Sequence, residues 1–381
     1  MDAWTNPGEL SSGFGGIFAG RRVLLTGHTG FKGGWLALWL HALGAELRAV
    51  SLPPETSPSL FDLAGVADLC DSRFADINDA AALRAAVAGF APELIVHMAA
   101  QAIVRDSYDT PVETFATNVV GTANVLEIAR QSASVRGVVV VTSDKCYENN
   151  EWDWGYREVD PLGGSDPYSA SKACTELVAQ AYRRSYFSAP DAARLASVRA
   201  GNVIGGGDWA AHRLIPDIVR ATAAGEDVTI RNPASVRPWQ HVLEPLSGYL
   251  MIAARLLGDD RDAVSGAWNF GPDTESTVPV GEVCALFARL WGEGGPRFVM
   301  QSNPDAPHEA GLLRLDSTKA RLHLGWRPRL GLADALALTT DWYRAQAGGA
   351  DMRQITLDQI AAYAGLMQPR AVLPETDMLA G

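Results

Sequence analysis

Cysteine is scarce in this sequence, and long hydrophobic runs are missing. Four cysteines occur in 381 residues, at positions 70, 146, 174 and 284, and no two of them have metal-ligand spacing. We therefore expect reduced thiols and no metal site. No run of about 18 apolar residues exists, so no membrane span is expected. Residues 1–20 lack the basic and apolar regions of a signal peptide, so we expect a cytoplasmic protein with no membrane partner.

An excess of positive charge is also missing. The chain has 32 Lys and Arg against 44 Asp and Glu, a formal net charge of -12. Because nucleic-acid phosphates are bound by clustered basic side chains, this balance argues against nucleic acid as a partner. Local basic pockets for a small diphosphate are compatible with it. Hydrophobic residues make up 47% of the chain, which is enough to fill two or three domains or one bilobed unit.

Buried strands alternate with helices along the first part of the chain. The expected strands lack the polar–apolar alternation of half-exposed strands, which suits a parallel sheet covered on both faces; they are residues 22–26, 47–52, 94–97, 138–141, 197–199 and 267–270. Helical patterns include Trp35 to Leu40 and Asn118 to Arg130. This alternation predicts an α/β fold with a Rossmann-like, doubly wound parallel sheet.

Glycine and proline become more frequent after Gly201, and the elements become shorter. We therefore expect a second, smaller α/β lobe that binds the substrate. The predicted division is a flexible N-terminal extension at 1–20, a dinucleotide-binding domain at 21–204 and 245–271, the smaller lobe at 205–244 and 272–350, and a C-terminal tail at 351–381.

A glycine-rich loop directly follows the first expected strand. Residues 27–33 read GHTGFKG and open the apolar helix. Glycines allow a tight turn and let backbone N–H groups approach a pyrophosphate, and the helix N-terminus adds partial positive charge. Three glycines can also form a purely structural turn. In this strand–loop–helix context we interpret the loop as a dinucleotide site, with contacts from Gly27, Thr29, Gly30, Phe31, Lys32 and Gly33.

The usual acidic anchor for the adenosine ribose is missing. In dinucleotide folds an Asp or Glu about 20 residues further on, at the end of the second strand, binds the ribose hydroxyls of NAD. Here residues 50–53 read VSLP, and the nearest acid is Glu55. No arginine follows the strand, so NADP is not favoured and weak NAD binding is expected. Asp76, followed by Ile77, is a candidate for holding the adenine amine, and a helix cap or a solvated loop acid is an equal alternative.

Tyr168 and Lys172 are spaced four residues apart. Asp166 and Pro167, just before them, are typical of an N-cap and a first helical position, which places both side chains on one face of a helix. A tyrosine with a pKa near 10 is a poor base. A neighbouring ammonium favours the phenolate, so we expect Lys172 to bring the pKa of Tyr168 closer to the working pH. A surface pair of no function is the alternative.

Polar residues follow the run of valines at 138–141. The sequence continues Thr142, Ser143, Asp144, Lys145. These residues are expected at the carboxyl end of a central strand, where ligands bind in such sheets. A solvated charged turn is the alternative.

Taken together, these motifs resemble the extended short-chain dehydrogenase/reductase family over roughly residues 21 to 345. The resemblance implies that Tyr168 is the base for oxidation of a sugar hydroxyl and that Lys172 holds the nicotinamide ribose. It also implies NAD as the cofactor and a nucleotide sugar as the partner. Further cofactor contacts implied by it are Ala99, Ala100 and Asn118, the asparagine being usually structural near the site.

The pair Asp144 and Lys145 resembles one branch of that family, the CDP-glucose 4,6-dehydratases. Five strings carry this resemblance: GHTGFKG at 27–33, WDWGYRE at 152–158, RAGNVIGGGDW at 199–209, RNPASVRPWQHVLEP at 231–245 and PHEA at 307–310. CDP-glucose is therefore the preferred substrate. The resemblance also implies homodimers joined through two helices per subunit, or dimers of dimers.

Substrate contacts are likewise implied by the resemblance. The diphosphate is expected at Asn202, Arg213 and Arg237, since arginine suits phosphate geometry, although a surface salt bridge is the alternative for each arginine. The base is expected along the backbone near Thr229 and Arg231. His308 lies in a loop expected to close over the nucleotide.

The residues support a dehydration hypothesis. Tyr168 takes the proton of the sugar C4 hydroxyl, Ser143 hydrogen-bonds the developing ketone, and the Asp144 and Lys145 pair removes the C5 proton and protonates the leaving C6 hydroxyl. Asp144 is the preferred acid, and the assignment within the pair stays open. The rivals are a 4-epimerase, which needs no Asp144 and Lys145, a 4,6-dehydratase for another nucleotide hexose, and a non-catalytic dinucleotide sensor, which needs no Tyr168.

Overall fold

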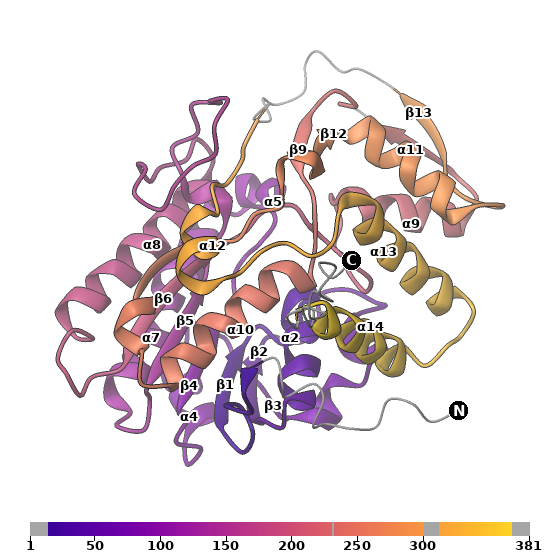
Figure 1. The fold of residues 1–381 in the computed structure, drawn as a ribbon. Helices are drawn as coiled ribbons and strands as arrows, with labels where there is room; N and C mark the ends of the chain where they lie inside the picture. The colour runs from indigo at the N-terminus through magenta and orange to yellow at the C-terminus, as the bar shows by residue number, and fades with distance from the viewer. Residues whose placement is uncertain (1–13, 231, 301–311, 368–381) are drawn as a thin grey trace, which may run out of the picture.

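A computed structural model of the chain describes residues 14–230, 232–300 and 312–367. At its centre lies a sheet of seven strands, all parallel (Figure 1). Their spatial order is β11 (Gly266–Asn269), β6 (Arg194–Arg199), β5 (Gly137–Val141), β4 (Leu94–His97), β1 (Arg22–Thr26), β2 (Glu46–Ser51) and β3 (Asp71–Phe74). The order reverses beside β1, which confirms the predicted doubly wound sheet and places a ligand crevice at the strand ends there.

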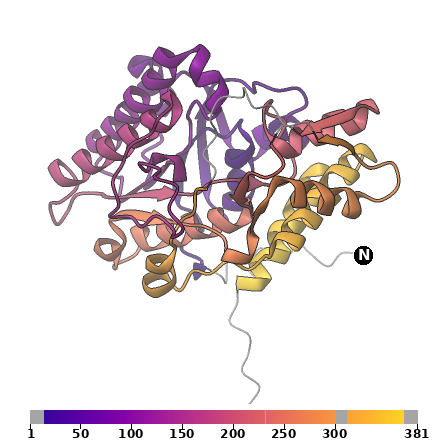
Figure 2. The ribbon, with the colours of Figure 1, turned by 90° about the horizontal axis from the view of Figure 1, so that it is seen from above.

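Helices cover both faces of this sheet (Figure 2). One face carries α4 (Ala80–Val87), α7 (Thr122–Gln131) and α8 (Pro167–Ser185), and the other carries α2 (Phe31–Ala42) and α10 (Leu243–Leu257). The valines of β5 divide between the two sides: Val138 and Val140 belong to one hydrophobic core, and Val139 and Val141 to the other. Because successive strand side chains point to opposite faces, a strand covered twice has no polar face.

A smaller set of elements follows β6 and lies at the carboxyl ends of the strands. It contains three two-stranded sheets. They pair β7 (Val203–Ile204) with β10 (Gln240–His241), β8 (Asp227–Ile230) with β13 (Arg297–Met300), and β9 (Val236–Pro238) with β12 (Thr277–Pro279). Its helices are α9 (Leu214–Ala224), α11 (Val280–Trp291) and α13 (Leu332–Ala347), whereas α12 (Thr318–Leu324) returns to the large sheet and packs against β11 and α10.

The hydrophobic core runs without a break from the large sheet into this second set. Ile218 of α9 and Phe287 of α11 belong to the same buried cluster as Val23 of β1 and Val198 of β6. The two predicted lobes therefore share one core, and their division at 205–244 and 272–350 stays a prediction about folding units.

Both ends of the described chain pack on α2, which differs from the predicted loose extension and tail. Phe18 is 1% exposed, and Phe14 meets Trp39 edge-on with ring centroids 6.2 Å apart. Residues 352–367 form helix α14 (Met352–Met367), whose Tyr363 meets the same Trp39 at 5.9 Å. Burying aromatic rings stabilises these segments, and sparse aromatics in polar surroundings give little periodic signal in the sequence.

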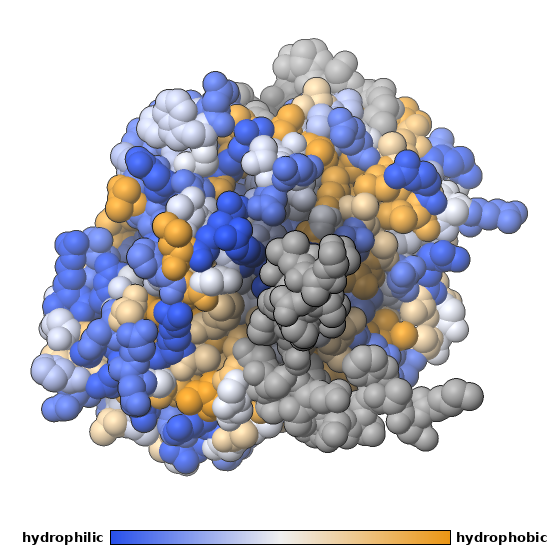
Figure 3. All heavy atoms as spheres, in the orientation of Figure 1, coloured by the Kyte–Doolittle hydropathy of each residue, from blue (hydrophilic) through white to orange (hydrophobic). Residues whose placement is uncertain are grey.

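The remaining elements are short. They are α3 (Leu60–Leu63), α5 (Val104–Asp109), α6 (Pro111–Phe115), a π-turn at Ala116–Gly121, and 3₁₀ turns at Val66–Leu69, Asp144–Cys146, Arg261–Val264 and Thr274–Ser276. Within the described residues, every helix is too short or too polar to cross a lipid bilayer. Hydrophilic side chains cover much of the face in Figure 3, with hydrophobic ones scattered between them.

Candidate active site

The glycine loop connects β1 to α2 and leaves room only for backbone. A Cβ on Gly33 would lie 2.0 Å from the carbonyl oxygen of Gly27, and Gly27 itself has φ +86. A Cβ on Gly27 would lie 2.7 Å from the backbone nitrogen of Ala99. The first turn of α2 holds no acidic residue, and Gly30 caps it without a side chain. These features form a cradle that fits a dinucleotide pyrophosphate.

Replacing Gly33 with alanine is expected to close this cradle. The new Cβ meets backbone atoms, which cannot rotate away as a side chain can. Losing one charge-assisted hydrogen bond of about 1.5–3 kcal/mol weakens binding by about tenfold or more. Calorimetric titration with NAD measures the loss. Gly365→Ala, in open space on α14, is the matched control and should keep the affinity; equal affinity in both variants would contradict the cradle.

His28 closes the end of β2, where the acidic anchor is missing. Its ring lies 3.0 Å from Ser51 Oγ on one side and 2.7 Å from Ser72 Oγ on the other. Burial lowers the pKa of His28 to about 4, so the ring is neutral at pH 7. Thr29 Oγ1 donates to the carbonyl of Leu52 at 3.0 Å, which ties the loop to the same strand end.

Asp76 lies in the turn after β3 and is exposed. Its carboxylate accepts the backbone N–H of Asn78 at 2.8 Å, while Asp79 caps α4. The neighbouring Ile77 is buried against Gly121, where a Cβ would lie 2.6 Å from its Cδ1. The contact with Asn78 does not decide between turn acid and adenine ligand, so the role of Asp76 stays a prediction.

Ala99 and Ala100 follow β4, and β1 holds the backbone at Met98 and Ala99. Thr26 Oγ1 accepts the backbone N–H groups of Met98 and Ala99, both at 3.1 Å. Asn118 lies in the π-turn and is 1% exposed. Its amide donates to Gln101 O at 3.0 Å and Ser171 Oγ at 2.8 Å. Both amide hydrogens are thus used within the protein, which favours the structural role for Asn118.

The predicted tyrosine–lysine pair, Tyr168 and Lys172, lies on α8. Asp166 accepts the backbone N–H of Ser169 at 2.9 Å and caps the helix, with Pro167 in the first turn. Lys172 Nζ is 6.0 Å from the centre of the Tyr168 ring. Both side chains are buried, with 8% of Tyr168 and 4% of Lys172 exposed. The predicted N-cap and helix face are those of the structure.

The acidity of Tyr168 differs from the expectation. Burial raises the pKa of Tyr168 to about 12, and a hydrogen bond with Ser143 opposes this in part. Burial also lowers the pKa of Lys172 to about 8. The sequence predicts that the Lys172 ammonium lowers the pKa of Tyr168 toward the working pH. This prediction is wrong for the protein alone, because burial disfavours the charged phenolate more strongly than the nearby ammonium favours it.

Ser143 and Asp144 lie at the end of β5, beside Tyr168. Ser143 Oγ donates to Asp144 Oδ1 at 3.0 Å and accepts the backbone N–H of Lys145 at 3.2 Å. Asp144 is 3% exposed, and its negative charge raises the pKa of Tyr168. Its carboxylate fills the space beside Gly201, where a Cβ would lie 1.8 Å from Oδ2. Ser143, Asp144 and Tyr168 therefore converge on one spot.

Lys145 is half-buried, and its amine makes no hydrogen bond within residues 14–230, 232–300 and 312–367. The structure thus brings the side chain of Asp144 into hydrogen-bond contact with the cluster, whereas Lys145 contacts it only through its backbone N–H among the described residues. Its part in the reaction stays a prediction.

Positive side chains surround this cluster. Lys32 Nζ lies 5.8 Å from the centre of the Tyr249 ring. Burial, together with the charges of Arg213 and Lys172, lowers the pKa of Lys32 to about 8, while Asp144 raises it. Three basic side chains lie in mutual electrostatic reach and are opposed by two acids, Asp144 and Asp208, an excess of positive charge that suits an anionic ligand. Tyr249 was missed by sequence reasoning because nothing local marks it in the apolar α10.

The predicted substrate residues are spread over the second set of elements. Arg213 donates to Asp208 Oδ2 at 2.9 Å, and its charge also lowers the pKa of Tyr168, so this salt bridge lies at the site. Arg237 on β9 donates to the carbonyl of Val236 at 2.9 Å and is half-buried. Asn202 has φ 47. Thr229 is exposed on β8. Arg231 and His308 lie outside the described residues.

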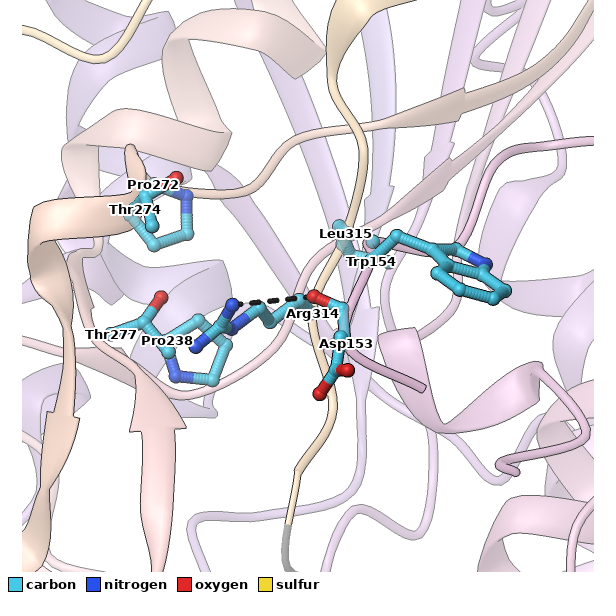
Figure 4. Close-up of a pocket in the computed structure, with 9 residues that line it drawn as sticks. Asp153, Trp154, Pro238, Pro272, Thr274, Thr277, Arg314 and Leu315 are labelled. Carbon is cyan, nitrogen blue, oxygen red and sulfur yellow. Dashed lines mark hydrogen bonds between the residues drawn. The ribbon is translucent and has the colours of Figure 1, made fainter. Parts of the chain in front are cut away.

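A hollow of about 210 Å³ lies next to β9 (Figure 4). Arg314 crosses it and donates to the carbonyl of Asp153 at 3.4 Å, and the Trp154 ring is turned away from Arg314. Its lining is Asp153, Trp154, Gly155, Pro238, Pro272, Thr274, Thr277, Arg314 and Leu315. None of these is a predicted site residue.

The doubly wound sheet, the glycine cradle and the buried tyrosine–lysine couple define an enzyme of the extended short-chain dehydrogenase/reductase class. Residues 24–339 match the family model for GDP-mannose 4,6 dehydratase. The chain belongs to this family of nucleotide-sugar dehydratases, which confirms the expected class.

Individual relatives agree with this assignment. The chain is 49% identical over 351 residues to "CDP-glucose 4,6-dehydratase" of Salmonella typhimurium, which covers 91% of the chain and 97% of the relative. It is similar to the crystal structure of DesIV, a dTDP-glucose 4,6-dehydratase from Streptomyces venezuelae with NAD and TYD bound, at TM-score 0.71 and 27% identity, covering 87% and 99%. The fold is also that of the epimerase Mth375 of Methanothermobacter thermautotrophicus, at TM-score 0.75 and 22% identity, covering 91% and 98%.

Proposed function

We propose that this chain is a CDP-glucose 4,6-dehydratase that converts CDP-glucose to CDP-4-keto-6-deoxyglucose and water with bound NAD. The observation that carries the proposal is the convergence of Ser143, Asp144 and Tyr168, since a sugar epimerase has no use for the buried acid. The 49% identity to the Salmonella enzyme over nearly its whole length supports CDP-glucose as the substrate.

The residues present fit NAD. The cradle at Gly27 and Gly33 would hold the pyrophosphate, and Lys172 would hold the nicotinamide ribose beside Tyr168. When bound, NAD would accept the hydride from C4 and give it back at C6, so the sugar would lose water without net oxidation. The absence of an acid at the end of β2 predicts weak cofactor binding.

The protein groups divide the proton transfers among them. Tyr168 Oη takes the proton of the C4 hydroxyl, and Ser143 Oγ stabilises the developing C4 ketone by hydrogen bonding. The ketone makes the C5 hydrogen acidic, and Lys145 removes it. Asp144 gives a proton to the C6 hydroxyl, which leaves as water. Once the hydride has returned to C6, Lys145 gives its proton back to C5, and the proton that Tyr168 took from the C4 hydroxyl passes to Asp144, which restores all three groups.

Incubation with NAD and the CDP, UDP, GDP and dTDP forms of glucose tests this function. The expected product of CDP-glucose is lighter than the substrate by one water. A product of unchanged mass with inverted C4 would indicate the epimerase, dehydration of a different nucleotide glucose would correct the substrate, and NAD binding without turnover would indicate the sensor.

The activity is expected to fall as the pH rises past about 8, because Lys172 loses its positive charge there. The effect of Lys172 on folding stability has the opposite sign: this group makes the protein more stable as the pH rises. In the unfolded chain a lysine keeps its proton up to its ordinary pKa, 10.5. Between these values the unfolded state binds more protons than the folded state, so this group makes folding more favourable as the pH rises. A pH profile of kcat with thermal unfolding at each pH checks both signs; activity and stability falling together would contradict the assignment.

We also propose a homodimer in the cytoplasm. Exposed apolar side chains gather on neighbouring elements α6, the π-turn and α8, among them Val112, Val120 and Leu177, and exposed apolar groups of this kind mark interfaces. A second copy of the chain is the occupant that the family resemblance implies. All four cysteines are free, as in a reducing compartment. Sedimentation should show a dimer or a dimer of dimers that Val112→Glu with Leu177→Glu dissociates.

A further inference from the structure

A buried ion pair lies behind the catalytic cluster and belongs to no step of the proposed reaction. Arg199, at the end of β6, donates to Glu176 of α8 through Nε at 2.9 Å and through Nη2 at 2.8 Å. Each side chain is 3% exposed. Burial opposes the charge of Glu176, and Arg199 overcomes this, so the pKa of Glu176 is below its ordinary value. The pair is therefore ionised and geometrically defined.

One end of the segment that carries Ser143 and Asp144 is bonded to this pair. Thr142, directly before Ser143, donates its hydroxyl to Glu176 Oε1 at 2.6 Å. Ser197 Oγ donates to Oε2 at 2.7 Å. With two bonds from Arg199 as well, the carboxylate accepts four hydrogen bonds, one from Thr142 just after β5 and three from side chains of β6, which together define its orientation.

The other end of the same segment is bonded to the other member of the pair. Arg199 Nη1 donates to Tyr147 Oη at 2.6 Å, and its guanidinium lies 4.8 Å from the centre of that ring. Tyr147 Oη donates in turn to Asn269 Oδ1 of β11 at 2.7 Å. Residues 143–146 are thus held between Thr142 and Tyr147 by a single ion pair.

The Glu176–Arg199 ion pair is also connected to Tyr168 and Lys172 through helix α8. Tyr168, Lys172 and Glu176 follow one another at intervals of four residues on α8, so they share a face of the helix. Gly201, two residues beyond Arg199, forms the wall against which the Asp144 carboxylate packs. The elements that carry the tyrosine, the acid and the wall behind the acid are therefore joined at one point.

We propose that Glu176 and Arg199 are positioning residues that set the distance between the Tyr168–Lys172 couple and the acid Asp144. A buried ion pair is seldom more stabilising than apolar residues of the same volume, whereas its directional hydrogen bonds fix the geometry of what it contacts. The inference rests on the proposed dehydration, in which oxidation at C4 needs only the couple, and loss of water needs Asp144 in register with it.

The test weakens the contacts without removing a buried charge, since removing one member of the pair threatens folding itself. Tyr147→Phe removes the bond to Arg199, and Thr142→Val removes the bond to Glu176. Tyr363→Phe and Thr356→Val remove buried hydroxyls of the same kind on α14, where they bond Glu244 at 2.8 Å and Trp342 at 3.0 Å. Thr142→Ser keeps the hydroxyl and serves as the rescue variant.

Two rates are measured after rapid mixing of the NAD-loaded enzyme with CDP-glucose: reduction of bound nicotinamide, by absorbance, and release of dehydrated sugar, by mass. A displacement of about 1 Å can slow a reaction by about a hundredfold, so we expect Tyr147→Phe and Thr142→Val to slow dehydration at least about tenfold more than oxidation. The ratio should stay that of the wild type in both α14 variants and return toward it in Thr142→Ser.

The outcomes separate the two proposals. A wild type that dehydrates CDP-glucose, with both rates falling by one factor in Tyr147→Phe and Thr142→Val, would show that the pair only supports the fold, and would overturn this inference alone. Unchanged rates in both variants would overturn it as well. A wild type that reduces nicotinamide and never releases a dehydrated sugar would overturn the proposed function, and the positioning role with it.

Discussion

Asp144→Asn is expected to keep oxidation at C4 and to slow the loss of water by about 10²–10⁴-fold, the usual contribution of a positioned acid. Asparagine has nearly the same shape, so it fits the space beside Gly201 and still meets Ser143. It has no acidic proton to give to the C6 hydroxyl. The tyrosine and the lysine are unaffected, so the first half of the reaction has all the groups that it needs.

The signature of this variant is an uncoupled reaction. Reduced nicotinamide should accumulate on mixing with CDP-glucose and persist, while the dehydrated product forms slowly. Asp79→Asn, which replaces the exposed N-cap of α4 by another good cap, is the matched control and should turn over normally. Near-normal dehydration by Asp144→Asn would show that the acid lies elsewhere, and Lys145→Met would then be the variant to measure.

Local signals made the two cofactor-side motifs predictable. The GHTGFKG loop lies between a strand and a helix that each have a clear pattern, so its place between β1 and α2 followed directly. The N-cap at Asp166 and the proline after it placed Tyr168 and Lys172 on one helix face. Interactions of this kind form within one or two helical turns, and the sequence shows them as spacing.

Contacts between distant segments were not predictable in this way. The packing of Asp144 against Gly201 joins residues that follow two different strands, β5 and β6, and the Glu176 to Arg199 pair joins a helix to a strand. Glu176 does continue the four-residue spacing of Tyr168 and Lys172, and this spacing is the only local sign that it shares their helix face. Its role depends on the ion pair with Arg199, and the strand order of the sheet decides that Arg199 lies next to it.

The pKa of Tyr168 shows a second limit, because burial is a property of the folded chain. The sequence places an ammonium near the phenol and so predicts a lower pKa. The fold buries both groups, and desolvation then dominates the phenol. The same reasoning applies to Lys32, which the sequence places in the glycine loop as a cofactor contact; in the fold it is buried beside Tyr249, and burial lowers its pKa to about 8.

Tyr168→Phe is expected to stop the reaction before it begins, with turnover lower by about 10²–10⁴-fold and no accumulation of reduced nicotinamide. The C4 hydroxyl then has no group to take its proton, so the hydride cannot leave C4 either. The phenyl ring fills the same buried space, and only the hydroxyl that meets Ser143 is lost. Affinity for NAD and for CDP-glucose should change little, since neither the cradle nor the basic side chains are altered.

Comparison with Asp144→Asn turns this into a test of the order of steps. Removing the tyrosine hydroxyl should leave the cofactor oxidised, whereas removing the acid should leave it reduced. Tyr363→Phe, which removes a buried hydroxyl on α14, is the control and should lower stability without changing the product. If Tyr168→Phe reduced nicotinamide at the wild-type rate, the base would be another group. If Tyr168→Phe released dehydrated sugar without reducing nicotinamide, water would be lost without prior oxidation at C4. That result would contradict the proposed order of steps, because without a C4 ketone the C5 hydrogen of the sugar is too weakly acidic to be removed.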